Sequence, residues 1–528
     1  MKTNLVGTAV QRSFVLGLIW SCFSIGAFAQ TPATSVDQRC SELSHLKLPD
    51  TQITMAQAIR PQPTYTLATP EGFPPAPVVV TTSFCRVAGT IAPAIRFEVW
   101  MPIEDWNGRF EGLGTGAFSG AISHGPLAQA VARGYAAGTT DGGHESDAMD
   151  ARWAMKGAKL NEALVADWAH RAMHEMTVKS KAIVQAFYGK APHHSYFVGC
   201  SSGGHQALTQ AQRYPQNYDG IVAGAPANYW THVMAGQMAY GLATRVDPAS
   251  DLEAPTSKLQ LIHDAVLAAC DAQDGVKDGV IENPAQCGFR PATLACKGAD
   301  SASCLTAPQV QALEKIYADV RTSDGRKIFP GLPPGSELAW PAMSALQVGF
   351  AESFYQYLVF QNPQWSYRTL NLDRDVAFAD QRIGKIVNSI NPDLSAFRAR
   401  GGKLIQYHGW SDWGISPHNS VDYYESVVAQ LAKGRDRATA LRETQQFDRL
   451  FMVPGMGHCA GGAGPDSFDG LAVLQRWVEE GVAPTQIIAA KIADGKTVRT
   501  RPLCPYPQTA HYKGTGSTDE AANFECKA

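Results

Sequence analysis

The sequence has little net charge and a low proportion of charged side chains. Its 528 residues include 45 Lys and Arg against 48 Asp and Glu, which gives a formal net charge of −3, and charged residues make up 18% of the chain. No basic stretch and no acidic tail stands out, so nucleic acid is not an expected partner. A glycine-rich stretch at residues 112–120 lacks the common phosphate-binding glycine patterns, and nucleotide binding is therefore not predicted from it.

Beyond its N-terminus, the chain has no apolar run of the ~20 residues that a membrane-spanning helix requires. The N-terminus has the pattern of a signal peptide, because Lys2 and Arg12 precede or flank an apolar stretch at 14–20 and Ala27-Phe28-Ala29 offers a cleavage site. We therefore expect residues 1–29 to be removed. The mature protein is then expected to be secreted or periplasmic, without membrane attachment.

The cysteine pattern contains no CxxC spacing, which argues against a zinc site and against a redox-active pair. Of eleven cysteines, Cys22 lies in the predicted signal peptide, and an even number remains. An even number of cysteines in an exported protein predicts disulfides, here five. Lipidation of Cys22 is the alternative to cleavage after Ala29, but bulky Trp20 occupies a position where a small residue is expected.

The most informative stretch is Gly199-Cys200-Ser201-Ser202-Gly203, which lies between a strand-like run at 195–198 and a helix-compatible run at 205–210. A Gly-x-Ser-x-Gly sequence between strand and helix is the nucleophile elbow of an α/β-hydrolase, whose glycines allow a tight turn that exposes the serine hydroxyl. An ordinary glycine turn is the alternative, and the flanking elements favour the elbow. Ser201 is then the nucleophile, and the N–H of Ser202 is one donor to an oxyanion.

The chain is long enough for more than one domain. After an N-terminal segment that we expect to be irregular, strand-like and helix-like runs alternate, which predicts βαβ units around a mainly parallel sheet. The first of these strands, at 95–102, alternates with period two, as a strand with one polar face does.

The alternation stops near residue 229, and the following segment carries many aromatic residues, four closely placed cysteines and Pro/Gly breaks before strand-like runs resume. We therefore predict an α/β-hydrolase fold with a large inserted lid domain. The predicted divisions are a signal peptide at 1–29, the first part of the core at 30–229, the lid at 230–395 and the second part of the core at 396–528.

A serine nucleophile needs a base to take its proton and an acid to orient that base. The strand-like runs at 402–409 and 449–455 are followed by Asp412 and His458, respectively. The order Ser201, Asp412, His458 is that of α/β-hydrolases, and sites in open α/β sheets form beyond the carboxyl ends of strands. These three residues are the predicted catalytic triad.

Further residues of the same types compete for two of the three roles. His408 and His418 are alternative bases, and Asp141 and Asp466 are alternative acids. His408 lies inside or at the end of a strand-like run, where a packing or substrate-facing role fits better.

Cys200-Ser201, Asp412 and His458-Cys459 resemble the CS-D-HC arrangement of the tannase and feruloyl esterase family. The likeness extends over nearly the whole mature chain, and its further blocks are residues 106–110, 141–144, 218–226 and 501–507. The resemblance implies a serine esterase with a lid over its site. It also implies the disulfides Cys40–Cys85, Cys200–Cys459, Cys270–Cys287, Cys296–Cys304 and Cys504–Cys526.

Similar lids hold a calcium ion, and the matching segment here is residues 271–280. The resemblance implies ligands from three carboxylates and two main-chain carbonyls, an oxygen-rich set that suits this hard cation. These ligands would be Asp271, Asp274, Val276, Asp278 and Val280. The loop is not an EF-hand, and without the resemblance it would equally fit a solvated acidic turn.

The second oxyanion donor is expected from the glycine-rich loop. By position it is the N–H of Ala117, with Gly116 as the alternative. The family has glycine at the position of Ala117, so this chain departs from the family pattern there.

The expected substrate is a small aromatic ester, derived from plant cell walls or tannins, whose acyl part is a phenolic acid such as ferulate or gallate. A terephthalate-monoester hydrolase of the same family uses a lid arginine to hold the free carboxylate, whereas residues 341–365 here contain no Arg or Lys. That activity is the alternative, and it would need Arg368 or Lys327 as the clamp. A polyphenol- or carbohydrate-binding protein without catalysis is a further alternative.

The same stretch holds five aromatic residues that either stack on the substrate ring or form the core of the lid. They are Phe350, Phe354, Tyr355, Tyr357 and Phe360.

Overall fold

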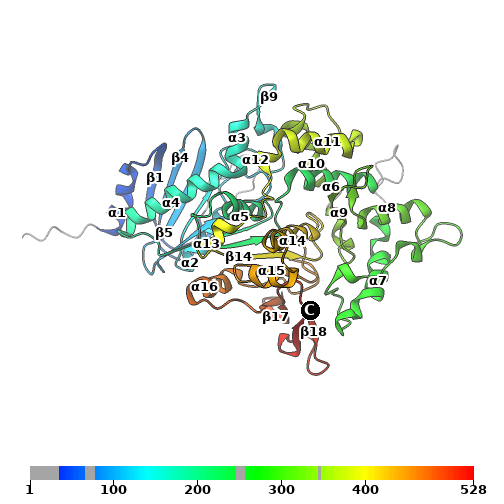
Figure 1. Ribbon diagram of the computed structural model, residues 1–528. Coiled ribbons are helices and arrows are strands. Elements are labelled where there is room, and N and C mark those ends of the chain that lie inside the picture. Colours follow the sequence, from blue (N-terminus) through cyan, green and yellow to red (C-terminus); the bar gives the residue numbers. More distant parts are fainter. Residues whose placement is uncertain (1–34, 66–77, 245–255, 343–346) are drawn as a thin grey trace, which may run out of the picture. The chain divides into compact units, whose positions relative to one another are not determined.

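A nine-stranded sheet with the order β1-β4-β5-β7-β6-β10-β11-β14-β15 forms the centre of the fold (Figure 1). The computed structural model describes residues 35–65, 78–244, 256–342 and 347–528. Strands β1, β4, β5 and β7 pair antiparallel, and every pair from β7 to β15 is parallel. The strands are β1 (Thr51–Ile59), β4 (Phe84–Ile91), β5 (Ile95–Pro102), β6 (Arg109–Leu113), β7 (Ala136–Thr140), β10 (His194–Cys200), β11 (Gly220–Gly224), β14 (Lys403–Gly409) and β15 (Asp448–Val453).

Alternate residues of each strand point to opposite faces of the sheet. Helices pack against both of these faces. One apolar cluster joins the sheet to α4 (Ala172–Tyr188), α5 (Ser202–Arg213), α13 (Ser395–Ala399) and α14 (His418–Ala432). A second joins it to α2 (His124–Ala132) and α16 (Gly470–Glu480) on the other face. The α/β-hydrolase fold is confirmed.

The N-terminal segment differs from its predicted irregular state. It contains α1 (Val36–Glu42), strands β1 and β4, and a small pair of β2 (Gln62–Tyr65) with β3 (Val78–Val80). The strand predicted at 95–102 is β5, and the face that carries Arg96 and Glu98 is largely buried. Its Glu98 is buried and forms a 2.6 Å ion pair with Arg86 of the neighbouring strand β4.

Between β11 and β14 lies a long connection whose described residues contribute no strand to the main sheet. Its own apolar cluster contains residues of the helices that it carries. These are α6 (Trp230–Ala243), α7 (Leu259–Cys270), α8 (Ala307–Tyr317), α9 (Trp340–Ala342), α10 (Val348–Phe354), α11 (Leu372–Ala379) and α12 (Lys385–Val387), together with the short strands β12 (Val320–Arg321) and β13 (Lys327–Phe329). The lid domain predicted at 230–395 falls in this connection, and its boundaries stay a prediction.

Smaller elements complete the described chain. They are β8 (Met155–Lys156), β9 (Lys159–Leu160), α3 (Glu162–Ala166), α15 (Arg437–Thr444) and the antiparallel pairs of β16 (Ile487–Ala493) with β17 (Lys496–Leu503) and β18 (Thr509–Tyr512) with β19 (Phe524–Lys527).

All five expected disulfides are present. Such a set is typical of proteins that fold in an oxidising compartment. The predicted signal peptide at 1–29, with Cys22, lies outside the described residues. In the described part of the chain, no helix has the length and apolar character needed to cross a membrane.

Candidate active site

Ser201 lies at the sharp turn between β10 and α5, with a positive φ of 63° and a ψ of −121°. Non-glycine residues rarely adopt this backbone conformation, so the neighbours must enforce it. The N–H of Ser201 donates to the carbonyl of Gly224 on β11 at 3.0 Å. A side chain at Gly199 would place its Cβ 2.4 Å from the carbonyl oxygen of Gly203. The glycines therefore permit the close strand–helix approach that an elbow needs.

The structure brings Ser201, Asp412 and His458 together from three loops beyond strand ends. The Nε2 atom of His458 lies 2.9 Å from Oγ of Ser201, and its Nδ1 atom lies 2.7 Å from Oδ2 of Asp412. These are the contacts of a nucleophile with its base and of that base with an orienting acid. The arrangement can remove the proton of Ser201 and hold the resulting imidazolium.

Asp412 is fully buried and accepts four hydrogen bonds. Its Oδ1 accepts from the N–H groups of Gly414 and Ile415 at 2.7 and 3.0 Å, and its Oδ2 is shared by His458 and His408. Burial alone would raise the pKa of Asp412, but the charge and hydrogen bonds of the two histidines lower this pKa well below its usual range. The carboxylate is therefore ionised throughout the physiological range.

The contact between Asp412 and His458 lowers the pKa of Asp412 and raises the pKa of His458. Burial lowers the pKa of His458, and the charge and hydrogen bond of Asp412 outweigh it, so the pKa lies above its usual value of 6.5. Asp412 thus strengthens His458 as a base.

His408, at the end of β14, uses both ring nitrogens in hydrogen bonds. Its Nε2 atom lies 2.9 Å from Oδ2 of Asp412 and 3.0 Å from the carbonyl oxygen of Ile415, and its Nδ1 atom lies 2.7 Å from Oγ of Ser420. Because Nε2 faces two acceptors, it carries the proton. His408 is fully buried next to Asp412 and is not among the residues that line the active-site cavity.

His418, Asp141 and Asp466 have partners outside the predicted triad. His418 begins α14 and packs against the ring of Trp410. Asp141 pairs with Arg96, and Asp466 pairs with Lys491. The histidine and the two aspartates are therefore engaged elsewhere, and His458 and Asp412 stay the predicted base and acid.

Ser201 and His458 open into a cavity of about 410 Å³, a size that suits a small aromatic ligand. It is bordered by both proposed oxyanion donors and by residues of α6, α10 and the Asp412 loop. The lining residues are Gly114, Thr115, Gly116, Ala117, Met149, Cys200, Ser201, Ser202, Ala227, Trp230, Val233, Met234, Gln237, Gln347, Phe350, Gly414, Ile415, His458 and Cys459.

Ala117 has a positive φ of 44°, in the left-handed region that favours glycine. A glycine at this position would adopt the same conformation without strain. Within the described residues, neither the N–H of Ala117 nor that of Ser202 is used in a main-chain hydrogen bond. Both groups are therefore available as donors at the cavity wall. The N–H of Gly116, the alternative donor, is likewise not used in a main-chain hydrogen bond among the described residues, while its carbonyl accepts from Ser119 at 2.8 Å.

Of the five lid aromatics, Phe350 borders the cavity. Phe354 and Tyr355 are fully buried in the core of the insertion, and Tyr357 and Phe360 pack against it. No Arg or Lys is among the described residues that line the cavity, and neither Arg368 nor Lys327 reaches it. Lys327 instead forms a 2.7 Å ion pair with Asp422.

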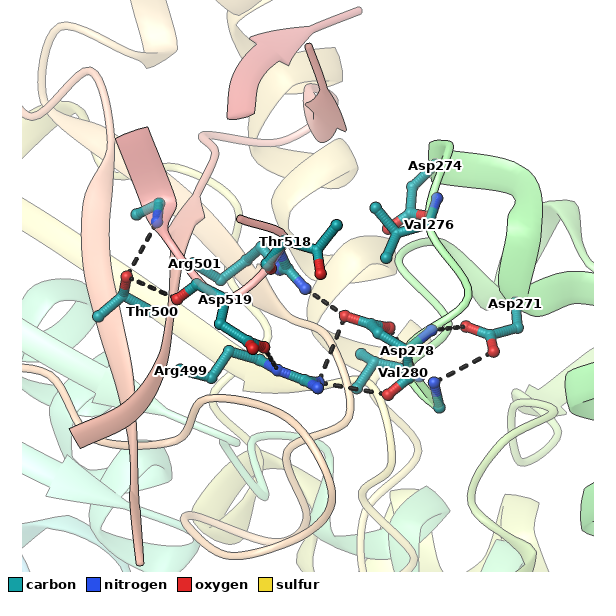
Figure 2. Close-up of polar contacts among 12 residues, drawn as sticks. Asp271, Asp274, Val276, Asp278, Val280, Arg499, Thr500, Arg501, Thr518 and Asp519 are labelled. Carbon is teal, nitrogen blue, oxygen red and sulfur yellow. Dashed lines mark hydrogen bonds and ion pairs between the residues drawn. The ribbon is translucent and has the colours of Figure 1, made fainter. Parts of the chain in front are cut away.

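The acidic loop at 271–280 is held by its own side chains (Figure 2). The two carboxylate oxygens of Asp271 accept from the N–H groups of Asp278 and Gly279 at 3.2 and 3.1 Å. Asp278 also pairs with Arg499 and Arg501 of β17. Asp274 is buried, and among the described residues no basic side chain pairs with it.

A buried carboxylate without an ion pair suits a cation, and the loop is rich in oxygen atoms, the ligands that calcium prefers. The carboxylates of Asp271, Asp274 and Asp278 do not, however, form a group of described residues whose ligand atoms lie within 4.8 Å of one another. Among the described residues, the His, Cys, Asp and Glu side chains whose potential metal-ligand atoms lie within 4.8 Å of one another are Cys296, Asp300 and Cys304. These three form no metal site, because the two cysteines are oxidised to a disulfide.

Sequence reasoning missed the face of α6 that borders the cavity. Trp230, Val233, Met234 and Gln237 have the spacing i, i+3, i+4 and i+7 of one helix face. This pattern equally indicates an ordinary buried helix face. Only Gln237, a polar residue within that face, could have indicated from the sequence that the face borders a binding site.

Comparison with known proteins places these features in one family. The model of the family described as "Tannase and feruloyl esterase" matches residues 78–527. An uncharacterized esterase of Xanthomonas campestris is 38% identical over 96% of this chain and 94% of its own. The mono(2-hydroxyethyl) terephthalate hydrolase of Piscinibacter sakaiensis is 36% identical over 84% of this chain and 85% of its own. The crystal structure of feruloyl esterase B from Aspergillus oryzae superposes with a TM-score of 0.85 at 29% identity, covering 93% of this chain and 100% of that one.

Proposed function

The chain belongs to the tannase and feruloyl esterase family and is a carboxylic ester hydrolase, and on this premise we propose that it hydrolyses esters of phenolic acids through an acyl-enzyme on Ser201. The observation that carries the proposal is the contact of His458 with both Ser201 Oγ and Asp412 Oδ2, at 2.9 and 2.7 Å, beside a largely apolar cavity.

In this mechanism, His458 Nε2 takes the proton of Ser201 as its oxygen attacks the ester carbonyl carbon. Asp412 holds the imidazolium through Nδ1–H. The N–H groups of Ala117 and Ser202 donate to the developing oxyanion, which stabilises charge that is present only in the tetrahedral intermediate. His458 then gives its proton to the leaving alcohol, and a water molecule activated by the same histidine releases the acid.

The alcohol is proposed to leave on the far side of His458. There His458 borders a second cavity of about 320 Å³, whose lining includes Trp413 and Ser411. Since His458 protonates the leaving oxygen, the alcohol portion must lie near this histidine.

A structural calcium ion held by Asp271, Asp274, Asp278 and the carbonyls of Val276 and Val280 is part of the proposal. It would offset the buried charge of Asp274 and tie the insertion to the C-terminal β17 through Asp278 and its arginine partners. Export through the signal at residues 1–29 is proposed as well, and the five disulfides support it.

Terephthalate-monoester hydrolysis is the second candidate, which the 36% identical relative favours. The lining residues provide no cation for the free carboxylate of such a substrate, so we expect this activity to be weak.

The test is a set of initial hydrolysis rates on methyl ferulate, methyl gallate and mono(2-hydroxyethyl) terephthalate, with Ser201→Ala beside the wild type. Turnover of ferulate or gallate esters that is lost in the variant supports the proposal and names the acyl group. Faster hydrolysis of the terephthalate ester would favour the second candidate. The absence of turnover on all three would point to a binding protein.

A further inference from the structure

The α6 face that borders the active-site cavity is apolar except at one position. Trp230, Val233 and Met234 are buried and contribute mainly carbon atoms to the wall. Gln237 lies one turn further along the same face and is only 2% exposed. A polar side chain this deeply buried is expected to satisfy all its hydrogen-bonding groups.

The carboxamide of Gln237 is satisfied on one side only. Its Nε2 atom donates to the carbonyl oxygen of Gly414 at 2.7 Å. Because a carbonyl oxygen can only accept, this contact fixes which end of the amide faces Gly414. The Oε1 atom is then left buried without a hydrogen-bond partner among the described residues.

An unpaired buried carbonyl is costly, so a ligand that supplies a donor there gains affinity. The surrounding wall selects the kind of donor. Phe350 and Trp230 offer aromatic surface, and no lysine, arginine or carboxylate lines the described cavity. A neutral aromatic ring with a hydroxyl group fits this wall, whereas a carboxylate on the ring would meet a carbonyl oxygen and no cation.

We propose that Gln237 Oε1 accepts a hydrogen bond from a ring hydroxyl of the acyl group and so makes the enzyme selective for phenolic over unsubstituted or terephthalic acyl rings. This inference rests on the proposed function and adds the residue that recognises the substrate class. Gln237 is a specificity residue and takes no part in bond making. Its link to Gly414, whose N–H binds Asp412, also places the recognised ring beside the triad loop.

The test compares kcat/KM on methyl 4-hydroxycinnamate with kcat/KM on methyl cinnamate, which differ only in the ring hydroxyl. We expect the wild type to prefer the hydroxylated ester by about tenfold or more. In Gln237→Met, which keeps the length of the side chain, the two esters should be hydrolysed about equally. The ratio is taken within one protein, so a general effect of the substitution on folding or on the triad cancels.

Gln356→Met is the matched control. Gln356 lies in the same insertion, half-buried, and its Nε2 donates to the carbonyl of Trp365 at 2.8 Å outside the cavity. This variant should keep the wild-type ratio. A ratio that stays the same in Gln237→Met would overturn the inference and leave the esterase function intact. It would direct attention to the larger cavity of about 840 Å³ beyond Thr115 and Ala117.

A wild-type enzyme that hydrolyses neither ester would overturn the proposed function together with the inference. Should Gln237→Met fail to fold, calorimetric binding of the two esters to Ser201→Ala gives the second measurement. Binding of the hydroxylated ester about tenfold more tightly supports the inference, and equal binding contradicts it.

Discussion

Cys200 and Cys459 form a disulfide that joins the residue before the proposed nucleophile to the residue after the proposed base. The bond closes a sequence separation of 259 residues. It therefore connects two loops of the sheet that no local structure would hold together, at the point where Ser201 and His458 must stay within hydrogen-bonding distance.

We expect the double variant Cys200→Ser, Cys459→Ser to lose about 10- to 100-fold in kcat, because small displacements of reacting groups are costly. Its stability should fall by about 2–5 kcal/mol. Hydrolysis rates and thermal unfolding measure both effects. The control is Cys296→Ser, Cys304→Ser, which opens a separation of only 8 residues away from the cavity. An equal loss of kcat in the two double variants would contradict the aligning role.

The pH dependence should follow His458, which must be neutral to act as a base. Since the Asp412 contact raises the pKa of His458 above 6.5, activity is expected to be complete above this raised pKa and to fall as pH drops through it. Asp412→Asn removes the charge that raises the pKa, so the acid limb of the kcat/KM profile should move to lower pH. We also expect kcat to fall by about 10⁴-fold. An acid limb that does not move would assign this limb to another group.

His408 should support the acid through the hydrogen bond of its Nε2 atom to Asp412. His408→Leu leaves the buried carboxylate with one donor fewer, and we expect a loss of about 1–3 kcal/mol in stability together with a lower kcat. His408→Gln keeps an amide donor in the side chain and should recover part of both. Urea unfolding measures the stability of both variants, and hydrolysis rates measure their kcat. If the two variants are equally impaired, the packing of the His408 ring, and not its hydrogen bond, supports Asp412.

Ala117 carries backbone strain at a proposed oxyanion donor, since its φ is 44°. Ala117→Gly should relieve about 1 kcal/mol of strain, offset by the greater freedom of glycine in the unfolded chain, so we expect little change in Tm or kcat. Ala117→Val puts a β-branched side chain in the same conformation and should reduce both. If the valine variant matches the wild type in kcat, the N–H of Ala117 is not the donor.

Removal of calcium should destabilise the protein if the 271–280 loop binds it. We expect a chelator to lower Tm and added Ca²⁺ to restore it, because the ion binds the folded state. Asp274→Asn should make Tm independent of both, since it removes the buried charge that has no basic partner in the described structure. Asp300→Asn, in the exposed loop of the Cys296–Cys304 disulfide, is the control and should respond like the wild type. A wild-type Tm that ignores chelator and Ca²⁺ would exclude a structural calcium ion.

Local patterns were enough to predict the parts of the fold and site that depend on short-range rules. The elbow follows from the glycines around Ser201, whose missing side chains are a steric requirement. Asp412 and His458 follow from strand ends, because parallel strands bring their carboxyl ends to one edge. Strands β10, β14 and β15 were expected within a few residues of their observed bounds. The N-terminal strands β1 and β4 were missed, because neither fits the β-α alternation on which the prediction depended.

By itself, the sequence determined the family, the α/β-hydrolase architecture and the three candidate catalytic residues, since those are encoded in local spacing and chain order. Only the tertiary structure decided that His408 shares Oδ2 of Asp412 with His458, and that Gln237, which borders the cavity, has a buried Oε1 atom without a hydrogen-bond partner among the described residues. The reason is physical. The hydrogen bond between Gln237 and Gly414 joins residues that are 177 positions apart in the sequence. No local pattern of polar and apolar residues predicts such a contact.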